Sequence, residues 1–267
     1  RVDHLLGSIS PGRYADIILS EALYPIKPTH VFYKGELVAQ NGELIAQIPR
    51  ANYPEWFYHT VQVTRGKRAE DFVLSAPGSK ARVRVIEIYP DQIINKAGQA
   101  ELPVINSNVV SDVNQDVLKI AAVERYGKNG NIGIAFVKGF GLNQGALASS
   151  VAHDHHNIVL VGVTEEDMAL CVQAIENMQG GLVVASGGRI LGTLPLPLGG
   201  LMNPSPVHDV INALNELTQL AQQLGCRLPA PFMTLSFISL PTVPDYGLTD
   251  KGLVDVREHK VISPFFE

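Results

Sequence analysis

The chain has 267 residues, of which 46% are hydrophobic and 18% are charged, with a net charge of −5. This composition excludes a disordered chain, and the mild acidity without any Lys/Arg run gives no attraction to nucleic acid or to an anionic membrane. The sequence contains no run of 18 apolar residues, the length that could span a bilayer. Its two cysteines, Cys171 and Cys226, are too few for a disulfide scaffold. We therefore expect a cytoplasmic globular protein.

The first residues, Arg1 to Gly7, include no methionine and no signal-peptide pattern. Gly7 follows a short amphipathic run and is typical of the residue that ends a helix. We therefore expect the chain to be the C-terminal piece of a longer protein, which continues a helix that begins upstream.

Residues 1–50 predict short strands joined by turns. The apolar run 15–19 and the alternating run 29–33 are typical strands, and Asn41-Gly42 is a strong hairpin signal between two further ones. Three or four such strands make a partial sheet that other strands must complete. Residues 51–78 read as a linker, in which Trp56, Phe57 and Tyr58 are expected to pack against a domain, an aromatic binding patch being the alternative.

From residue 79 onward, strands and helices alternate without an internal repeat. Hydrophobic periodicity and turn signals predict helices over 112–126, 165–178 and 206–224, and strands over 81–89, 104–108, 132–137, 158–163, 182–185, 189–194 and 232–240. We expect Ser205 to cap the third helix, and the segment from Lys138 to Ala146 to open a short one. Such a mixture of hairpins and helices predicts an α+β domain over residues 79–267.

Three of the eight histidines lie in the segment Ala152-His153-Asp154-His155-His156-Asn157, directly before a buried strand. Strand ends are where a scaffold presents functional groups. If the segment is extended, His153 and His155 share one face and His156 points to the other. If a turn covers 153–156, His153 and His156 converge, and Asp154 could orient one ring. The alternative is a hydrogen-bonded surface loop.

Other motifs carry weaker signals. The stretch from Lys138 to Ala146 has the spacing G-x-G-x-x-x-G, which is not the dinucleotide-binding pattern and contains no G-K-[ST]. We expect its glycines to serve tight turns. Ser149 and Ser150 lie near His153 but lack a nucleophile elbow, which argues against a Ser-His-Asp triad. Cys171 is expected to be a packed thiol.

An ordered set of segments resembles the C-terminal domain of bacterial adenine deaminases. The segments are Glu124-Arg125-Tyr126-Gly127, Gly139-Phe140-Gly141-Leu142, His153-Asp154-x-His156-Asn157, Leu194-Pro195-Leu196-Pro197, Gly200-Leu201-Met202 and Leu235 to Pro241. Upstream, the segment from Leu6 to Ile18 is similar to the one by which amidohydrolase-superfamily chains leave their barrel and return to a flanking β-sandwich. The resemblance therefore implies a fold in which residues 1–50 end the barrel and return to a partial β-sandwich, and the α+β domain follows.

The resemblance also implies an activity. Such enzymes hydrolyse adenine to hypoxanthine and ammonia, in purine salvage and adenine catabolism, through a hydroxide activated by a divalent metal, manganese or iron. Their metal ligands come mainly from a (β/α)₈ barrel, which needs roughly 250 residues and has no room here. The implied partners are adenine, the missing N-terminal barrel and further copies of the chain, and this piece alone is expected to be inactive.

Matching the family pattern H-D-S-H-N assigns roles residue by residue. The match implies that His153, Asp154 and His156 take part in catalysis, that Asn157 binds substrate, and that His153 and His156 could also ligate a metal. His155 stands where serine is usual. We hypothesise that this loop faces the barrel mouth and helps to close the active site. The alternatives are a non-catalytic metal-binding module and a structural or oligomerisation module.

Overall fold

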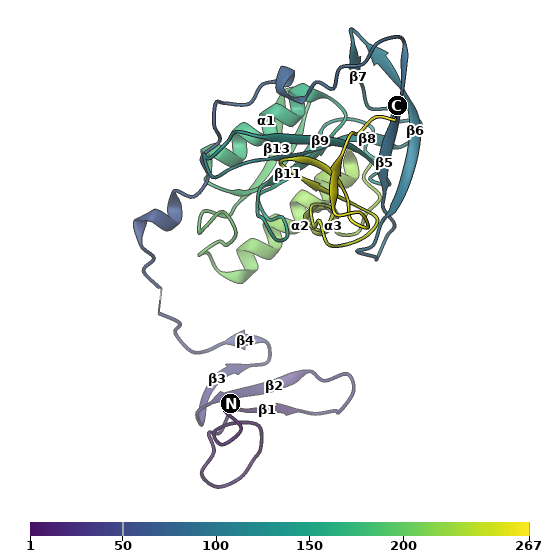
Figure 1. Cartoon of the computed structure of the whole chain (residues 1–267). Coiled ribbons are helices and arrows are strands. Elements are labelled where there is room, and N and C mark those ends of the chain that lie inside the picture. Colours follow the sequence, from purple (N-terminus) through teal and green to yellow (C-terminus); the bar gives the residue numbers. More distant parts are fainter. Residues whose placement is uncertain (50, 267) are drawn as a thin grey trace. The chain divides into compact units, whose positions relative to one another are not determined.

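The computed structural model describes residues 1–49 and 51–266 and divides the chain into two compact units, Arg1–Tyr53 and Pro54–Glu267 (Figure 1). The first unit is a four-stranded antiparallel sheet in the order β1-β2-β3-β4. Its strands are β1 (Ile17–Ser20), β2 (Pro28–Tyr33), β3 (Glu36–Gln40) and β4 (Glu43–Leu44).

The predicted hairpin of the first unit is confirmed, and the predicted end of a helix is wrong. Asn41 and Gly42 both have positive φ, as a tight hairpin between β3 and β4 requires. Residues 3–9 form only turns and bends, with Leu5 and Leu6 donating to the carbonyl oxygen of Val2. Gly7 therefore ends a turn, and its φ of +95° suits that role equally well.

The second unit is built on a nine-stranded sheet in the order β13-β12-β10-β11-β8-β9-β5-β6-β7. All neighbouring strands are antiparallel except β5 and β9, which are parallel. The strands are β5 (Lys80–Glu87), β6 (Lys96–Ile105), β7 (Asn108–Val109), β8 (Val117–Val123), β9 (Ile132–Lys138), β10 (Ala146–Ser149), β11 (Ile158–Gly162), β12 (Gly181–Ser186) and β13 (Arg189–Pro195). A separate antiparallel sheet consists of β14 (Tyr246–Thr249), β15 (Gly252–Asp255) and β16 (Lys260–Ile262).

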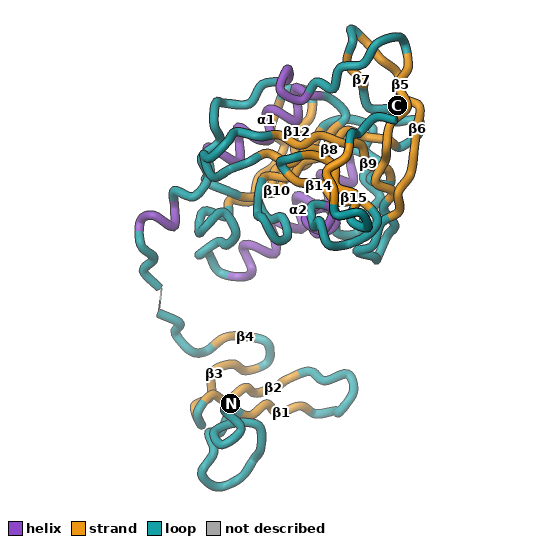
Figure 2. The backbone as a smooth tube through the Cα atoms, in the orientation of Figure 1, coloured by secondary structure: helices purple, strands orange, loops and turns teal. Residues whose placement is uncertain are grey.

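Helices cover both faces of the large sheet. The helix α1 (Glu165–Asn177) packs on one face, and α2 (Val207–Gln223) and α3 (Pro231–Ile238) lie on the other (Figure 1). Two short 3₁₀ helices, η1 (Glu55–Tyr58) and η2 (Ala69–Phe72), precede the first strand of this sheet, and Figure 2 shows how loops link the helices to the central strands.

The central strand β11 explains why helices must pack on both faces of the large sheet. All of its residues are buried. Ile158 and Leu160 belong to the core under α1, while Val159 and Val161 belong to the core under α2 and α3. Alternate side chains of a strand point to opposite faces, so a strand that is apolar at every position requires packing on both sides. The predicted strand over 158–163 is thus confirmed, and the helix α1 follows it as expected.

The helix predicted over 112–126 is wrong, because this segment contains β8. Its residues from Val117 to Val123 are all buried, including Lys119. The Lys119 ammonium is paired with the carboxylate of Glu165 and donates to the carbonyl oxygen of Phe72 at 3.0 Å. A single charged residue inside the apolar run imitates the polar side of a helix, whereas here its charge is neutralised inside the protein.

Three smaller expectations also change. Residues 232–240 were expected to close the sheet as a strand, but Pro231–Ile238 form the helix α3, with the proline in the first turn, where its missing N–H costs nothing. Ala146 begins the strand β10 rather than a helix. The helix α2 starts at Val207 after Pro206, one residue later than predicted, so Ser205 is not its cap.

The fold class predicted from the sequence is confirmed: helices and largely antiparallel sheets make an α+β structure. Within the described residues, no helix combines the length and the apolar character that crossing a membrane requires.

Candidate functional site

The clustered histidines form a turn between β10 and β11. The backbone N–H of His156 donates to the carbonyl oxygen of Ala152 at 2.6 Å and closes this turn. The helix α3 anchors it, because the N–H of His153 donates to the carbonyl oxygen of Ser236 at 3.1 Å and the Ser239 hydroxyl donates to that of His153 at 3.2 Å. The segment thus has the turn geometry and not the extended one. We call residues 153–156 the histidine turn.

His155 holds the histidine turn through both ring nitrogens. Its Nε2 lies 3.2 Å from the carbonyl oxygen of Ser239, and its Nδ1 accepts the backbone N–H of Asn157 at 3.0 Å. A carbonyl oxygen only accepts, so Nε2 carries the proton and the ring is neutral. Burial lowers the pKa of His155 and favours this neutral form. His155 therefore acts as an anchor.

His153 and His156 come together in the histidine turn. Their ring centroids are 6.0 Å apart in an edge-to-face arrangement, and the ring of His153 also packs on Phe237 at 4.9 Å. The Nδ1 atom of His156 is buried and has no hydrogen-bond partner among the described residues. Burial lowers the pKa of His156, and the positive charge of Arg125 lowers it further. The two imidazoles are thus neighbours that do not bond to each other.

Asp154 and Asn157 differ sharply in their surroundings. Asp154 is exposed, and in the described part of the chain no hydrogen bond joins its carboxylate to a histidine ring. Asn157 is buried, and its side-chain amide donates to Asp250 Oδ1 at 3.3 Å, in the turn between β14 and β15. The Oδ1 atom of Asn157 lacks a partner within the described residues. The structure therefore joins the backbone of Asn157 to the His155 ring and leaves one acceptor of its side chain without a partner among the described residues.

The site does not form a metal centre by itself. Residues 1–49 and 51–266 contain no group of three or more His, Cys, Asp or Glu side chains that could hold a metal ion. His153 and His156 provide two imidazoles at most, and the exposed Asp154 adds no third ligand. Since a protein-bound transition metal usually takes three or four protein ligands, the residues described here do not fit such an ion unaided.

Arg125 is part of the same neighbourhood, and the sequence analysis did not single it out as a site residue. It follows β8, is only 2% exposed, and donates from Nη2 to the carbonyl oxygen of Gly199 at 3.0 Å. Its guanidinium carbon lies 5.3 Å from the ring centre of Tyr126, whose hydroxyl donates to the carbonyl oxygen of His155 at 2.6 Å. The signal available in the sequence was the position of this arginine, close behind the apolar run that ends at Val123.

Glu124 organises the loop that follows β8. Its buried carboxylate accepts backbone N–H groups of four residues at 2.6–3.3 Å: Tyr126, Lys128, Asn129 and Gly130. Burial alone would raise the pKa of this carboxyl group, but the four hydrogen bonds outweigh burial and hold the pKa below its usual value. Glu124 is thus occupied by the backbone and does not compensate the charge of Arg125.

The remaining motifs have structural roles. Ser150 donates from Oγ to the carbonyl oxygen of Gly200 at 2.6 Å, and Ser149 bonds to the backbone of Val151, so neither hydroxyl bonds to a histidine in the described structure. The glycine stretch turns tightly, with Gly139 and Gly141 at positive φ. Cys171 is fully buried, and burial raises the pKa of its thiol.

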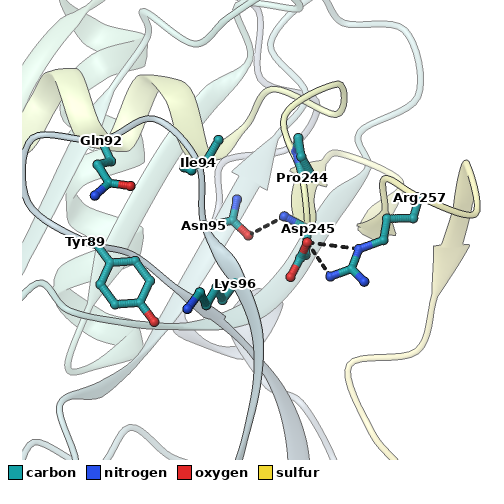
Figure 3. Close-up of a pocket in the computed structure, with 8 residues that line it drawn as sticks. All are labelled: Tyr89, Gln92, Ile94, Asn95, Lys96, Pro244, Asp245 and Arg257. Atoms are coloured by element: carbon teal, nitrogen blue, oxygen red, sulfur yellow. Dashed lines mark hydrogen bonds and ion pairs between the residues drawn. The ribbon is translucent and has the colours of Figure 1, made fainter.

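A separate pocket of about 480 Å³ lies between the end of β5, the start of β6 and the loop before β14 (Figure 3). Lys96 Nζ stands 5.5 Å from the ring centre of Tyr89 on one side, and Arg257 is paired with Asp245 on the other. The backbone N–H of Asp245 donates to Oδ1 of Asn95 at 3.2 Å. None of the site residues expected from the sequence lines this pocket.

Comparison with known proteins identifies the class to which this α+β domain and its histidine turn belong. Residues 92–260 match the family described as the adenine deaminase C-terminal domain, and the match encloses Arg125, the histidine turn and Asn157. The chain belongs to this family, as the resemblance in its sequence motifs implied.

Individual relatives carry the same name. The chain is 52% identical to an adenine deaminase of Desulforamulus reducens, which it matches over its whole length and over 45% of that protein. It is 44% identical to adenine deaminase 1 of Carboxydothermus hydrogenoformans, over 97% of the chain and 43% of the relative. An adenine deaminase of Methanococcoides burtonii is 41% identical, over 100% and 45%. The chain thus spans less than half the length of these curated relatives.

Proposed function

We propose that this chain is the C-terminal part of an adenine deaminase and that the full-length protein hydrolyses adenine to hypoxanthine and ammonia. The observation that carries this proposal is the family match over residues 92–260. Relatives named adenine deaminase, 52% and 44% identical, support it. The reaction replaces the exocyclic amino group at C6 by oxygen from water, so the site must hold a purine and pass protons to the departing nitrogen.

The side chains around the histidine turn suit part of that task. Asn157 Oδ1 is a free acceptor and His156 Nδ1 is a ring nitrogen without a partner among the described residues. An amide oxygen accepts from an exocyclic amino group, as asparagine does when it recognises adenine edge-on. The lowered pKa of His156 keeps its imidazole neutral near neutral pH, where such a ring can accept or donate a proton. We therefore assign Asn157 to substrate binding and His153, Asp154 and His156 to the reacting end of the site.

The proposed reaction also involves a divalent metal, manganese or iron, which would supply hydroxide near neutral pH. The residues described here do not provide its ligand set. We assign metal binding mainly to the part of the full-length protein outside this chain, a barrel domain, and we attribute no step in this chain to a metal.

The test is an assay of the full-length protein for hypoxanthine and ammonia formed from adenine, compared with the 267-residue chain alone. We expect turnover by the full-length protein and none by the chain alone. In the full-length protein, the double change His153→Ala/His156→Ala should lower kcat by about 100-fold or more, within the range for lost acid–base and positioning groups. Thermal unfolding, monitored by circular dichroism, should remain cooperative.

The matched control is His208→Ala, which removes an exposed imidazole on α2. It should leave kcat within about twofold of the unmodified protein, as surface substitutions usually do. Unchanged kinetics of the double variant would contradict the role of the histidine turn, whereas failure of the full-length protein to deaminate adenine would contradict the proposed function itself.

A further inference from the structure

The buried guanidinium of Arg125 lacks a counter-ion. Its Nε and Nη1 atoms have no hydrogen-bond partner among the described residues, and no carboxylate there forms an ion pair with it. Burying an unpaired charge costs several kcal/mol, so a cation kept in this state needs a role that outweighs the cost. Folding stability alone would be served better by an apolar side chain of similar volume.

Arg125 lies near the histidine turn but does not pair with it in strand register. The backbone carbonyl oxygen of Arg125 accepts the N–H of Gln62 at 2.7 Å, and Tyr126 forms a β-bridge with Gln62 beyond the end of β8. The positive charge of Arg125 nevertheless acts on His156, whose pKa it lowers. The stacking of Arg125 on Tyr126, whose hydroxyl bonds to the backbone of His155, ties the guanidinium to the same turn.

On its other side, Arg125 holds residues 198–202, which we call the glycine turn. The N–H of Leu198 donates to the carbonyl oxygen of Met202 at 3.0 Å across this turn, and Arg125 Nη2 donates to Gly199. Gly200 has a φ of +71°, and a Cβ atom added there would overlap Nη1 of Arg125. Glycine at position 200 therefore gives the guanidinium its space.

We propose that Arg125 is a positioning residue for adenine deamination: its guanidinium joins the glycine turn to the histidine turn and thereby fixes where the His156 imidazole lies. This inference rests on the proposed function, and it adds a residue to which the sequence comparison assigns no role. A permanently charged fork suits the task, because it donates to the glycine turn while its charge lies over the ring of Tyr126. Arg125 itself need not touch the substrate.

Two adjacent glycines provide a matched test in the full-length protein. Gly200→Ala displaces the guanidinium, whereas Gly199→Ala adds a methyl group that meets nothing within 4 Å, at a similar φ of +66°. Both variants carry the same left-handed backbone strain. Since displacing a positioned group by about 1 Å costs up to about 100-fold in rate, Gly200→Ala should lower kcat for adenine at least about tenfold more than Gly199→Ala does. KM should change by less than about threefold, because the interaction lost acts on the reacting geometry.

A double-mutant cycle distinguishes positioning from a general loss of structure. If Arg125 acts through His156, then in a His156→Ala background Gly200→Ala should lower kcat by less than about twofold more. Arg125→Lys, which retains the charge but not the planar fork, should lower kcat in the unmodified background and add little in the His156→Ala background. If the fold-loss in kcat of the double variant equals the product of the two single losses, the two residues act independently and the inference is overturned. Equal kcat values for Gly199→Ala and Gly200→Ala would overturn it as well.

A readout independent of turnover separates this inference from the proposed function. The rate at which diethyl pyrocarbonate modifies His156, mapped by mass spectrometry, should change in Gly200→Ala and stay near the original rate in Gly199→Ala. If the unmodified protein does not deaminate adenine, the proposed function fails, but this modification rate still decides whether Arg125 positions His156. Equal rates in the two variants would overturn that role.

Discussion

The carboxylate of Glu124 accepts hydrogen bonds from four backbone N–H groups. Replacing it by Gln removes the negative charge and turns one of its two acceptor atoms into a donor, which leaves backbone N–H groups of residues 126–130 without a partner. We expect Glu124→Gln to lower the free energy of unfolding by about 1–3 kcal/mol, measured by urea denaturation at pH 7. The exposed Glu258→Gln serves as the control and should cost less than about 0.5 kcal/mol.

The effect of Glu124 should depend on pH with a definite sign. Since the pKa of this group is lower in the folded protein than in the unfolded chain, its contribution is fully present above the ordinary glutamate pKa of about 4.3. The contribution is lost as the pH falls through the lower folded value. The stability difference between the unmodified protein and Glu124→Gln should therefore be constant near neutrality and shrink in acid. A difference that grows in acid would contradict this assignment.

At the residue scale, the sequence predicted the histidine turn but not its supporting contacts. The spacing of His153 and His156 left two geometries open, and the anchoring of the turn by α3 decides between them. Arg125 could not be recognised from its neighbours in the sequence, because its guanidinium donates to Gly199 and its charge acts on His156, and both residues are far along the chain. Its burial depends on segments that are distant in the sequence, such as residues 62 and 199, and local periodicity does not encode these contacts.

At the scale of single elements, α2 shows how an amphipathic pattern maps onto packing. Leu217 is 1% exposed within the core, whereas Ile211 on the same helix is 47% exposed. Leu217→Ala should lower the free energy of unfolding by about 2–4 kcal/mol, because it leaves a cavity beneath the helix. Ile211→Ala should cost less than about 1 kcal/mol, since little buried area is lost and alanine favours the helix.

Urea denaturation of both α2 variants checks this prediction. The free energy of unfolding should fall with urea concentration at the same slope in both variants, so that the difference between them reports stability alone. Similar losses for the two variants would mean that the exposed face carrying Ile211 is covered in solution, for example by the remainder of the full-length protein. That outcome would contradict the packing described for α2 and would assign a second interface to the helix.

Among the elements predicted with the wrong type, the helix over 112–126 and the strand over 232–240 share one physical origin. Residues 117–123 are buried at every position, and residues 231–238 are apolar except for Thr234 and Ser236, so the spacing of apolar residues does not distinguish a strand from a helix in either run. Tertiary contacts decide them: the pairing of Lys119 with Glu165 permits a strand, and Pro231 favours the start of a helix. Where one side faces solvent, as in α2, the periodicity predicted the element correctly.

At the scale of the whole molecule, the two units differ in how much apolar surface they bury. In residues 1–49 and 51–53 no side chain is buried, and the sheet exposes large apolar residues such as Leu19 and Tyr33. The expectation that this sheet must be completed by other strands agrees with that surface. The three apolar cores of the described structure contain only residues from Val61 onward.

This distribution of buried residues leads to a prediction about truncation. A chain of residues 54–267 should unfold cooperatively on heating, with a midpoint within about 3 °C of that of the 267-residue chain, because no core residue is removed. The separate peptide 1–53 should show no cooperative transition by circular dichroism, since a two-faced exposed sheet of this size buries too little apolar area to offset its chain entropy. A midpoint lowered by more than about 10 °C would show that the second unit depends on the first. A folded peptide 1–53 would show that this sheet is self-sufficient, and then the rest of the full-length protein would not be needed to complete it.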